Sequence, residues 1–456
     1  MMKERIAIVG AGLVGCMLGC LLARRGHQVT IFEKRDYLKT TKSVARRSTH
    51  LVISNRGWKA LDAIESTGEV KRASLPLQGR CVHLEDGSEV FMPYGSAGQS
   101  IYAIHRHTLN EILQRRCDET KGLEMRFGMR CVGVDMDRGA LTVEPTDSSG
   151  CYVFSFDRIF GADGAFSDVK NILSKIVGFE CEGRYESYGY KEISIPHGSD
   201  VRLNTDVMHA WPRGEVSIFA FPNQDASFTS TLIAPLNTDN TFRNITNVQE
   251  FESVIRRLFA DLDPDPLKID FLENPVSKLF SSSSPHWTFG GKVALIGDAA
   301  HAMVPFLGQG MNAGFEDCMT VVNLLDKNDE DFTAVLSKYE DLRKANCDAV
   351  MKMSSENFIE LTKYVSDKAF IQRKLIERRI QILFPDKYVP LYEMIAFTDI
   401  PYGEVLHRSI ELNSLTDTLM RNLKKGYVET DEQLNDLIYS TVLDDVDRGV
   451  YEAKNN

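Results

Sequence analysis

Apolar residues form two uninterrupted runs near opposite ends of the chain, from Ile6 to Val9 and from Val293 to Ile296. Each run ends in a glycine-rich turn followed by a helical pattern, which predicts a buried strand leading into a helix. Shorter strand-like runs, separated by turn residues, cover residues 189–196, 216–223 and 228–234. From residue 331 to residue 384 apolar positions recur at intervals of three and four, which predicts helix. The chain is therefore expected to combine an α/β part, further strands and a C-terminal helical region.

The first turn has the spacing of a dinucleotide-binding loop, with Gly10, Gly12 and Gly15 in a Gly-x-Gly-x-x-Gly pattern. These glycines permit the tight turn, close approach of a pyrophosphate to the backbone, and packing of the helix on the strand. A second strand at residues 28–33 ends in Glu33, an acid at the spacing that suits the adenosine ribose hydroxyls. This context favours a bound dinucleotide over the signal peptide or membrane span that apolar residues 6–23 superficially suggest.

The second turn follows Gly297-Asp298, is rich in proline and glycine, and opens a helix near Gln309. The Asp298 carboxylate suits a ribityl hydroxyl, and the free N–H groups of a helix start stabilise the anionic pyrimidine edge of a reduced flavin. The two turns together predict bound FAD. The residues expected around the flavin ring are Pro305, Leu307, Gly308, Gly310, Met311 and Asn312, the last two also as cofactor-binding residues.

Composition agrees with a globular enzyme of 456 residues with 43% hydrophobic and 26% charged residues. The net charge of −11 argues against nucleic acid as a partner. Nine cysteines are scattered without a Cys/His motif, which favours reduced thiols in the cytoplasm and no metal site. The polar C-terminal tail has no run that would span a bilayer, so no membrane association is expected.

The two turns, with a third segment at Gly161-Ala-Asp163-Gly164, resemble the single-component FAD-dependent aromatic hydroxylases. The resemblance implies a Rossmann-like FAD-binding domain of residues 1–75, 100–178 and 286–330. It also implies a mostly antiparallel, substrate-covering sheet of residues 76–99 and 179–285, and a C-terminal helical region of residues 331–456. Arg47, Arg106 and Asp163 are then expected to contact FAD, although Gly-Ala-Asp-Gly alone also fits a plain turn. The resemblance also implies that NADPH binds only transiently, which fits the absence of a second nicotinamide fingerprint from the sequence.

Within that family, residues 188–193, 208–214, 225–231 and 388–397 are similar to the kynurenine-hydroxylating members. Such a substrate has a carboxylate that needs a cation and neutral donors, and an aniline ring that needs an apolar slot. Arg80, Tyr94, Asn357 and Tyr392 stand where those members bind the substrate. The chain departs from their pattern at His50, His105, Leu307 and Leu361.

The resemblance implies that NADPH and O2 hydroxylate L-kynurenine to 3-hydroxykynurenine through a flavin hydroperoxide. No acid–base residue and no obligatory protein partner are expected. Because Leu307 and Leu361 are expected near the ring slot, a kynurenine analogue stays open as the small aromatic amino acid substrate. So do a tryptophan-derived indole as substrate of the same fold and, more remotely, a non-catalytic FAD-fold binding protein.

Overall fold

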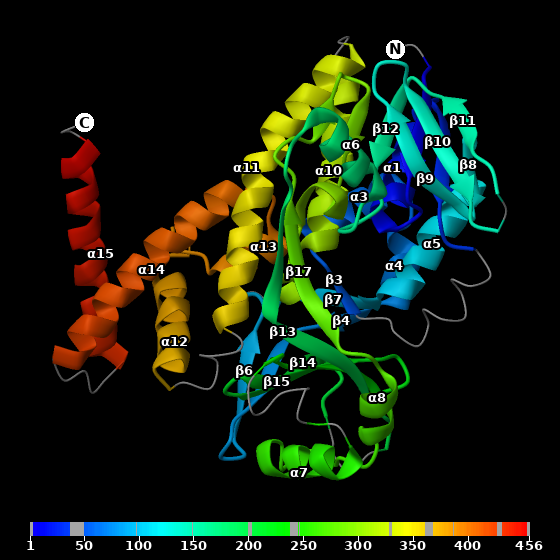
Figure 1. Ribbon diagram of the computed structural model, residues 1–456. Helices are drawn as coiled ribbons and strands as arrows, with labels where there is room; N and C mark the ends of the chain where they lie inside the picture. The colour runs from blue at the N-terminus through cyan, green and yellow to red at the C-terminus, as the bar shows by residue number, and fades with distance from the viewer. Residues whose placement is uncertain are drawn as a thin grey trace.

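The computed structural model describes residues 3–36, 50–96, 98–147, 149–198, 203–237, 245, 247–327, 331–360, 368–385, 387–425 and 431–453. Figure 1 shows an α/β part at the top, a large sheet below it, and a group of helices reaching to the left. This arrangement confirms the mixed α/β class, with a C-terminal helical region, that the sequence predicts.

A six-stranded sheet forms the centre of the α/β part, in the order β18, β19, β12, β1, β2 and β8. In that order the strands cover Thr288–Phe289, Val293–Leu295, Arg158–Gly161, Arg5–Val9, Gln28–Glu33 and Leu123–Phe127. Neighbours pair in parallel except β18 with β19. Helices α1 (Leu13–Ala23), α5 (Arg106–Glu119) and α10 (Gly310–Lys327) share its hydrophobic core. The central strands are apolar throughout because both of their faces are covered.

The large lower sheet has seven strands in the order β17, β13, β16, β15, β14, β5 and β6. In that order they cover Ser277–Ser283, Glu182–Ile195, Phe228–Pro235, Val216–Pro222, Val207–Arg213, Gly79–His83 and Glu89–Pro93. All pairs are antiparallel except β14 with β5, which run in the same direction. Helices α7 (Val248–Leu258) and α8 (Lys268–Glu273) lie beneath this sheet in Figure 1.

Two three-stranded sheets complete the described strands. One contains β11 (Tyr152–Ser155), β10 (Ala140–Pro145) and β9 (Met129–Asp135), and the other contains β3 (His50–Ile53), β7 (Ile101–His105) and β4 (Leu75–Leu77). The short helices are α3 (Asn55–Ala63), α4 (Thr67–Ala73), α6 (Asp168–Val177), α9 (Asp298–His301) and the 3-10 helix η1 (Pro305–Leu307).

The C-terminal region contains α11 (Phe332–Ile359), α12 (Lys368–Leu383), α13 (Leu391–Phe397), α14 (Tyr402–Lys425) and α15 (Asp431–Ala453). In Figure 1, α11 runs beside both larger sheets, while α12, α14 and α15 extend away from them. None of the described helices has both the length and the apolar character needed to cross a bilayer.

Two elements differ in extent from the sequence expectation. Strand β13 begins at Glu182 rather than at residue 189, because its first half pairs with β17. This half is mostly exposed and shows no alternation of apolar residues, so the sequence pattern did not predict it as a strand. A register shift between Tyr185 and Gly189 joins its two halves. The helical pattern of residues 331–384 is divided between α11 and α12, and Leu361 lies between them, outside the described residues.

Candidate flavin and substrate cavity

The turn between β1 and α1 contains three glycines with different surroundings. Gly10 has a φ of +107°, and a Cβ on it would lie 2.6 Å from the Ala162 carbonyl oxygen. A Cβ on Gly15 would lie 1.9 Å from the Gly10 carbonyl oxygen, so only glycine lets α1 pack this closely. A Cβ on Gly12 would have no atom within 4 Å, and this glycine borders the large cavity described below. The backbone at Gly12 is therefore an open cradle that fits an FAD pyrophosphate.

Glu33, at the end of β2, borders the same cavity. Its Oε2 accepts the Ala11 N–H at 2.9 Å, and its Oε1 accepts from Arg35 Nε at 2.8 Å. Burial opposes ionisation of this carboxyl, but the hydrogen bonds and charge of Arg35 outweigh burial and lower the pKa of Glu33. Glu33 is thus an ionised acceptor, as a ribose hydroxyl requires.

The segment from Asp298 to α10 forms a second wall of the cavity. Asp298 begins α9, and Gly308 closes η1 with a φ of +64°. The Ala313 N–H bonds to the Gln309 carbonyl oxygen, so the N–H groups of residues 310–312 precede the hydrogen-bond ladder of α10. Pro305, Leu307, Gly308, Gly310 and Met311 all border the cavity. This helix start presents positive backbone dipole to any anion bound beside it.

The Asn312 side chain turns away from the cavity and holds the wall together. Its Oδ1 accepts the Ser54 N–H at 3.0 Å, and its Nδ2 donates to the carbonyl oxygens of Val52 and Gly308, each at 2.8 Å. The side chain is fully buried. Only the backbone of Asn312 is therefore oriented to serve a cofactor.

Asp163 borders the cavity, but its carboxylate is used to begin α6. Ser167 Oγ donates to Oδ1, and the Val169 N–H donates to Oδ2 at 3.1 Å. Burial outweighs these bonds and raises the pKa of Asp163. Asp163 thus accepts an N–H group of the first turn of α6, and this contact fixes the Gly161–Gly164 turn beside the cavity.

A single cavity of about 680 Å³ connects these segments with the face of the large sheet that is turned towards the α/β part. It extends from Gly12 and Glu33, past Asp298 and the start of α10, to Arg80 on β5. Tyr94, Asn357 and Tyr392 line it beside Arg80. A volume of this size is in the range of cofactor and ligand sites.

Arg80 is the cation at the sheet end of the cavity. Its guanidinium carbon lies 6.0 Å from the ring centroids of both Tyr94 and Tyr392, whose rings are 5.0 Å apart. No carboxylate among the described residues forms an ion pair with Arg80. Asn357 Nδ2 donates to the Phe306 carbonyl oxygen at 2.9 Å, and its side-chain oxygen is an acceptor on a residue that lines the cavity.

The two tyrosines beside Arg80 are protonated. Burial raises the pKa of Tyr94 to about 12, although the positive charge of Arg80 opposes this effect. Burial also raises the pKa of Tyr392 well above its usual value. Tyr94 Oη lies 3.8 Å from the Met208 sulfur, a weak acceptor, so its hydroxyl stays available for a stronger one.

Several cavity residues were not found from the sequence, because they become neighbours only through strand pairing. The apolar ones include Met208, Phe219, Phe221 and Phe306, from the large sheet and η1. His50 pairs with His105 across β3 and β7, and their rings lie 4.1 Å apart. Burial and the neighbouring His105 lower the pKa of His50 to about 3, so this ring is neutral. In the sequence, the only indication that His50 and His105 belong to the cavity region was that both depart from the family pattern.

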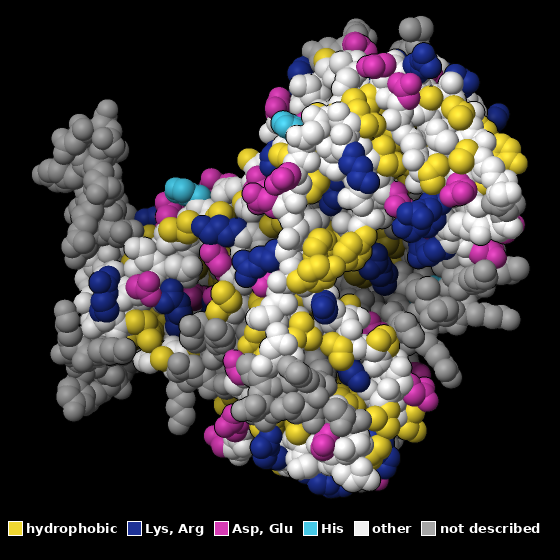
Figure 2. Space-filling view, viewed as in Figure 1, with side chains coloured by type: hydrophobic (Ala, Val, Ile, Leu, Met, Phe, Trp, Pro, Cys, Tyr) yellow, Lys and Arg dark blue, Asp and Glu magenta, His cyan; other side chains and the backbone are white. Residues whose placement is uncertain are grey.

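Cations gather at the mouth of the cavity. Figure 2 shows hydrophobic side chains beside Lys and Arg at mid-height on this face, between the α/β part and the large sheet. Lys34, Arg35, Arg106 and Lys278 border the cavity. Arg47, expected to contact FAD, lies outside the described residues.

Sequence comparison places the chain in a class of flavoproteins. The FAD binding domain family matches residues 3–354, which is most of the chain and includes both glycine turns. The cavity, the open cradle at Gly12 and this match together show that the chain has an FAD-binding domain.

Among curated proteins, the kynurenine 3-monooxygenase of Flavobacterium johnsoniae is 37% identical over 406 residues, covering 88% of this chain and 90% of that protein. The kynurenine 3-monooxygenase of Sus scrofa is 33% identical over 411 residues, covering 89% and 86%. The chain therefore belongs to the kynurenine 3-monooxygenase family, and the resemblance inferred from its sequence is confirmed.

Solved structures agree on the fold. A 2-methyl-3-hydroxypyridine-5-carboxylic acid oxygenase has a TM-score of 0.67 at 21% identity, covering 82% of this chain and 96% of that one. Pseudomonas aeruginosa PqsL, in complex with 2-aminobenzoylacetate, has a TM-score of 0.64 at 18% identity, covering 82% and 100%. At these identities the likeness extends to the fold alone.

Proposed function

We propose that this protein is an FAD-dependent monooxygenase that uses NADPH and O2 to hydroxylate the ring of L-kynurenine, giving 3-hydroxykynurenine. The observation that carries the proposal is Arg80, a cation without a carboxylate partner among the described residues, in the cavity that also contains Gly12 and Asp298. The family membership of the chain supports the same reaction.

Arg80 would bind the substrate carboxylate, because a guanidinium matches the two oxygens of a carboxylate and needs no proton exchange to do so. Tyr94 and Tyr392 remain protonated throughout the neutral range, so their hydroxyls would add neutral donors to that carboxylate. The Asn357 carbonyl oxygen would accept from the substrate ammonium group. These contacts fix one end of the substrate and so orient its ring.

The aromatic end of the substrate would lie among Met208, Phe219, Phe306 and Leu307. Leu307 is 1% exposed and packs in a core cluster with Met353 and Met394, which anchors this wall of the cavity. Gly10, Gly12, Glu33, Asp298 and the start of α10 would hold FAD, which would supply electron transfer from NADPH and activation of O2. The protein then contributes orientation and exclusion of water, and no described side chain in this slot is assigned an acid–base role.

Product analysis tests the reaction directly. The purified protein, incubated with L-kynurenine, NADPH, O2 and FAD, should give a product one oxygen atom heavier, with the added oxygen on the ring. Formation from the purified chain alone would also support the proposal that no obligatory protein partner is needed. NADPH consumption with hydrogen peroxide as the only product would refute kynurenine as substrate.

Arg80→Ala tests the carboxylate contact. We expect KM for L-kynurenine to rise about 10- to 100-fold, because a charge-assisted contact contributes roughly 1.5–3 kcal/mol. FAD content should be unchanged. A variant with wild-type KM would show that Arg80 does not bind the carboxylate. The matched control, Arg138→Ala, removes an exposed cation between β9 and β10 that pairs with Asp135 and should change neither value.

A kynurenine analogue is the second candidate substrate, because Leu307 and His50 form part of the cavity wall and depart from the family pattern. Comparing kcat/KM for L-kynurenine, ring-substituted kynurenines and tryptophan-derived indoles distinguishes these possibilities. We also propose a cytoplasmic location, which the nine free thiols support.

A further inference from the structure

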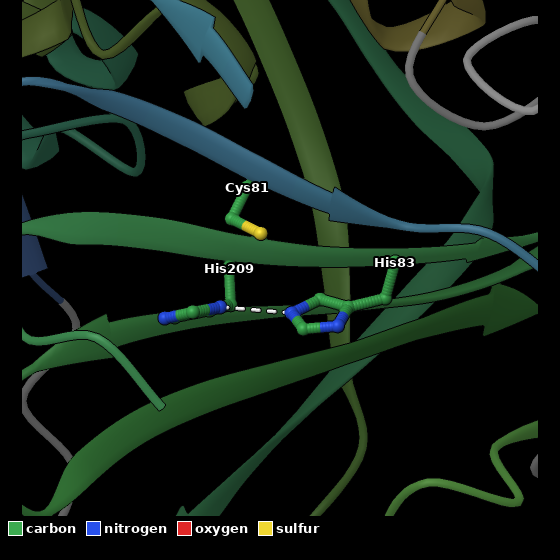
Figure 3. Close-up of side chains that lie close together, drawn as sticks. All are labelled: Cys81, His83 and His209. Carbon is green, nitrogen blue, oxygen red and sulfur yellow. Dashed lines mark hydrogen bonds between the residues drawn. The ribbon is translucent and has the colours of Figure 1, made fainter. Parts of the chain in front are cut away.

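Three side chains with metal-binding atoms gather on the face of the large sheet opposite to the cavity (Figure 3). On paired strands β5 and β14, Arg80 lies beside Met208 on the cavity side, and Cys81 lies beside His209 on the reverse side. His83 follows Cys81 on that side, because alternate residues of a strand share a face. Cys81, His83 and His209 are 8%, 7% and 2% exposed, and the proposed oxygenation uses none of them.

The two histidine rings face each other through one nitrogen each. His83 Nε2 and His209 Nδ1 are 2.8 Å apart, and Cys81 Sγ lies within 4.8 Å of both. Two tetrahedral nitrogen ligands of Zn²⁺, at about 2.0–2.1 Å from the ion, are roughly 3.3 Å apart. The rings therefore need to separate by only about half an ångström to admit an ion between them.

The outer nitrogens of both rings have the partners that metal-bound histidines usually have. His209 Nε2 is 2.9 Å from the Asn204 carbonyl oxygen, so this nitrogen carries the proton and Nδ1 is a free electron-pair donor. His83 Nδ1 lies 3.4 Å from Glu89 Oε1 and 3.7 Å from Asp261 Oδ2. A carbonyl or carboxylate behind the ring fixes its tautomer and strengthens the inner nitrogen as a ligand.

From this geometry we propose that Cys81 Sγ, His83 Nε2 and His209 Nδ1 form a binding site for a divalent metal ion of the zinc class. Glu89 supplies the fourth ligand, because its Oε2 is 3.5 Å from Cys81 Sγ and its exposed position gives the ion a route from solvent. Thiolate, imidazole and carboxylate in tetrahedral arrangement are ligands that Zn²⁺ accepts. The chain separation of 126 residues between His83 and His209 is why no spacing motif revealed the site.

Binding of the ion would move one proton within the His83 ring and release another from the Cys81 thiol. In the metal-free protein, His83 Nε2–H donates to His209 Nδ1, because that nitrogen has no proton. On binding, the His83 proton moves to Nδ1 beside Glu89 and Asp261, and the Cys81 thiol gives its proton to solvent. An ordinary thiol is protonated at neutral pH and binds a metal ion as the thiolate, so binding should release one proton per ion.

The test is titration of the full-length, FAD-loaded, chelator-treated protein with Co²⁺, whose visible d–d bands in tetrahedral sites lie at longer wavelengths than flavin absorption. We expect bands that saturate at one ion per chain, disappear on addition of Zn²⁺, and strengthen about tenfold in affinity per pH unit because one proton is released. Absence of these bands at any stoichiometry would overturn the proposal and leave a hydrogen-bonded histidine pair.

Substitutions of the proposed ligands test which side chains bind the metal ion. Cys81→Ser should lower Co²⁺ affinity at least about 10-fold and abolish proton release, while Glu89→Gln should lower affinity about 10- to 100-fold. Cys151→Ser, which removes the exposed thiol, is the matched control and should bind as the wild type does. Retained FAD and an unchanged urea midpoint without metal would show that the variants fold. Wild-type binding by Cys81→Ser would refute the assignment of the thiol.

Discussion

At the scale of single residues, the glycines of the first turn separate folding from cofactor binding. Gly12→Ala places a methyl group in open space, so we expect stability without FAD to stay within about 0.5 kcal/mol of wild type or rise slightly. FAD affinity should fall, because that methyl occupies the pyrophosphate cradle. Urea denaturation of the FAD-free protein and fluorescence titration with FAD measure the two effects.

Gly15→Ala should give the opposite pattern. Its Cβ would overlap the Gly10 carbonyl oxygen, so α1 must shift away from β1 and the protein should lose at least about 2 kcal/mol of stability. Equal stability of the two variants would show that Gly12 and Gly15 do not have the separate roles described above.

His50 gives a pH dependence whose direction follows from its pKa. In the folded protein this pKa is about 3, whereas an unfolded histidine titrates near 6.5. Between pH 3 and pH 6.5 only the unfolded chain takes up a proton on this ring. The contribution of neutral His50 to the free energy of unfolding is therefore complete above pH 6.5 and is lost as pH falls towards 3. From pH 7 to pH 5 the wild type should lose about 2 kcal/mol more than His50→Asn.

Urea midpoints at the two pH values, in the presence of excess FAD, measure this difference. His407→Asn serves as the control, because His407 is 69% exposed on its side chain. An identical pH response in His50→Asn and wild type would show that the His50 ring is solvated when the protein is folded.

Sequence reasoning reached residues whose place in the fold is set by their neighbours in the chain. Gly10, Gly12, Asp298 and Gly308 each lie in the turn that the sequence predicted, and their contacts with FAD stay predictions. Asn312 shows the limit, because its side chain bonds to Ser54 and Val52, more than 250 positions away. Packing of α10 against α3 and the end of β3 brings these groups together, and no local pattern reveals which buried amide side chain will bond to a distant backbone.

At the scale of elements, a buried ion cluster joins α9, α10 and α11. Asp317 on α10 accepts from His301 Nε2 at 2.6 Å and from Arg343 Nε at 2.8 Å, and both Asp317 and His301 are fully buried. These contacts hold the helix start that faces the flavin position. Apolar spacing predicted the helical pattern of residues 331–384, but it did not predict this cluster, because each member of the cluster looks like an isolated polar residue.

Asp317→Asn should cost about 3–5 kcal/mol, because it removes the buried carboxylate that His301 and Arg343 share and leaves Arg343 only Glu316 as a counter-ion. Asp326→Asn on the same helix removes the partner of Arg25 at an exposed position and should cost at most about 1 kcal/mol. Chemical denaturation of both variants measures the contrast. Comparable losses would mean that water reaches the Asp317 cluster.

At the scale of the whole molecule, one cavity extends between two sheets. Binding of a substrate at Arg80 should therefore change the absorption of a flavin bound in the same cavity. L-kynurenine binding without NADPH should shift the visible flavin spectrum, because the substrate ring replaces water beside it. Arg80→Ala should require about 10- to 100-fold more substrate for the same shift. If calorimetry shows that L-kynurenine binds but the flavin spectrum does not change, the substrate ring lies outside this cavity.

The parallel pairing of β5 with β14 also sets the order in which the protein is made. Strand β5 ends at His83, whereas β14 ends at Arg213, about 130 residues later. At synthesis rates of about 5–20 residues per second, the β5–β6 hairpin waits on the order of ten seconds for its neighbour. During that time the edge carrying Arg80 has unpaired N–H and C=O groups, which invite pairing with other chains. The same wait applies to β12, which ends at Gly161 while its neighbour β19 begins at Val293, so aggregation during expression should respond to both strands.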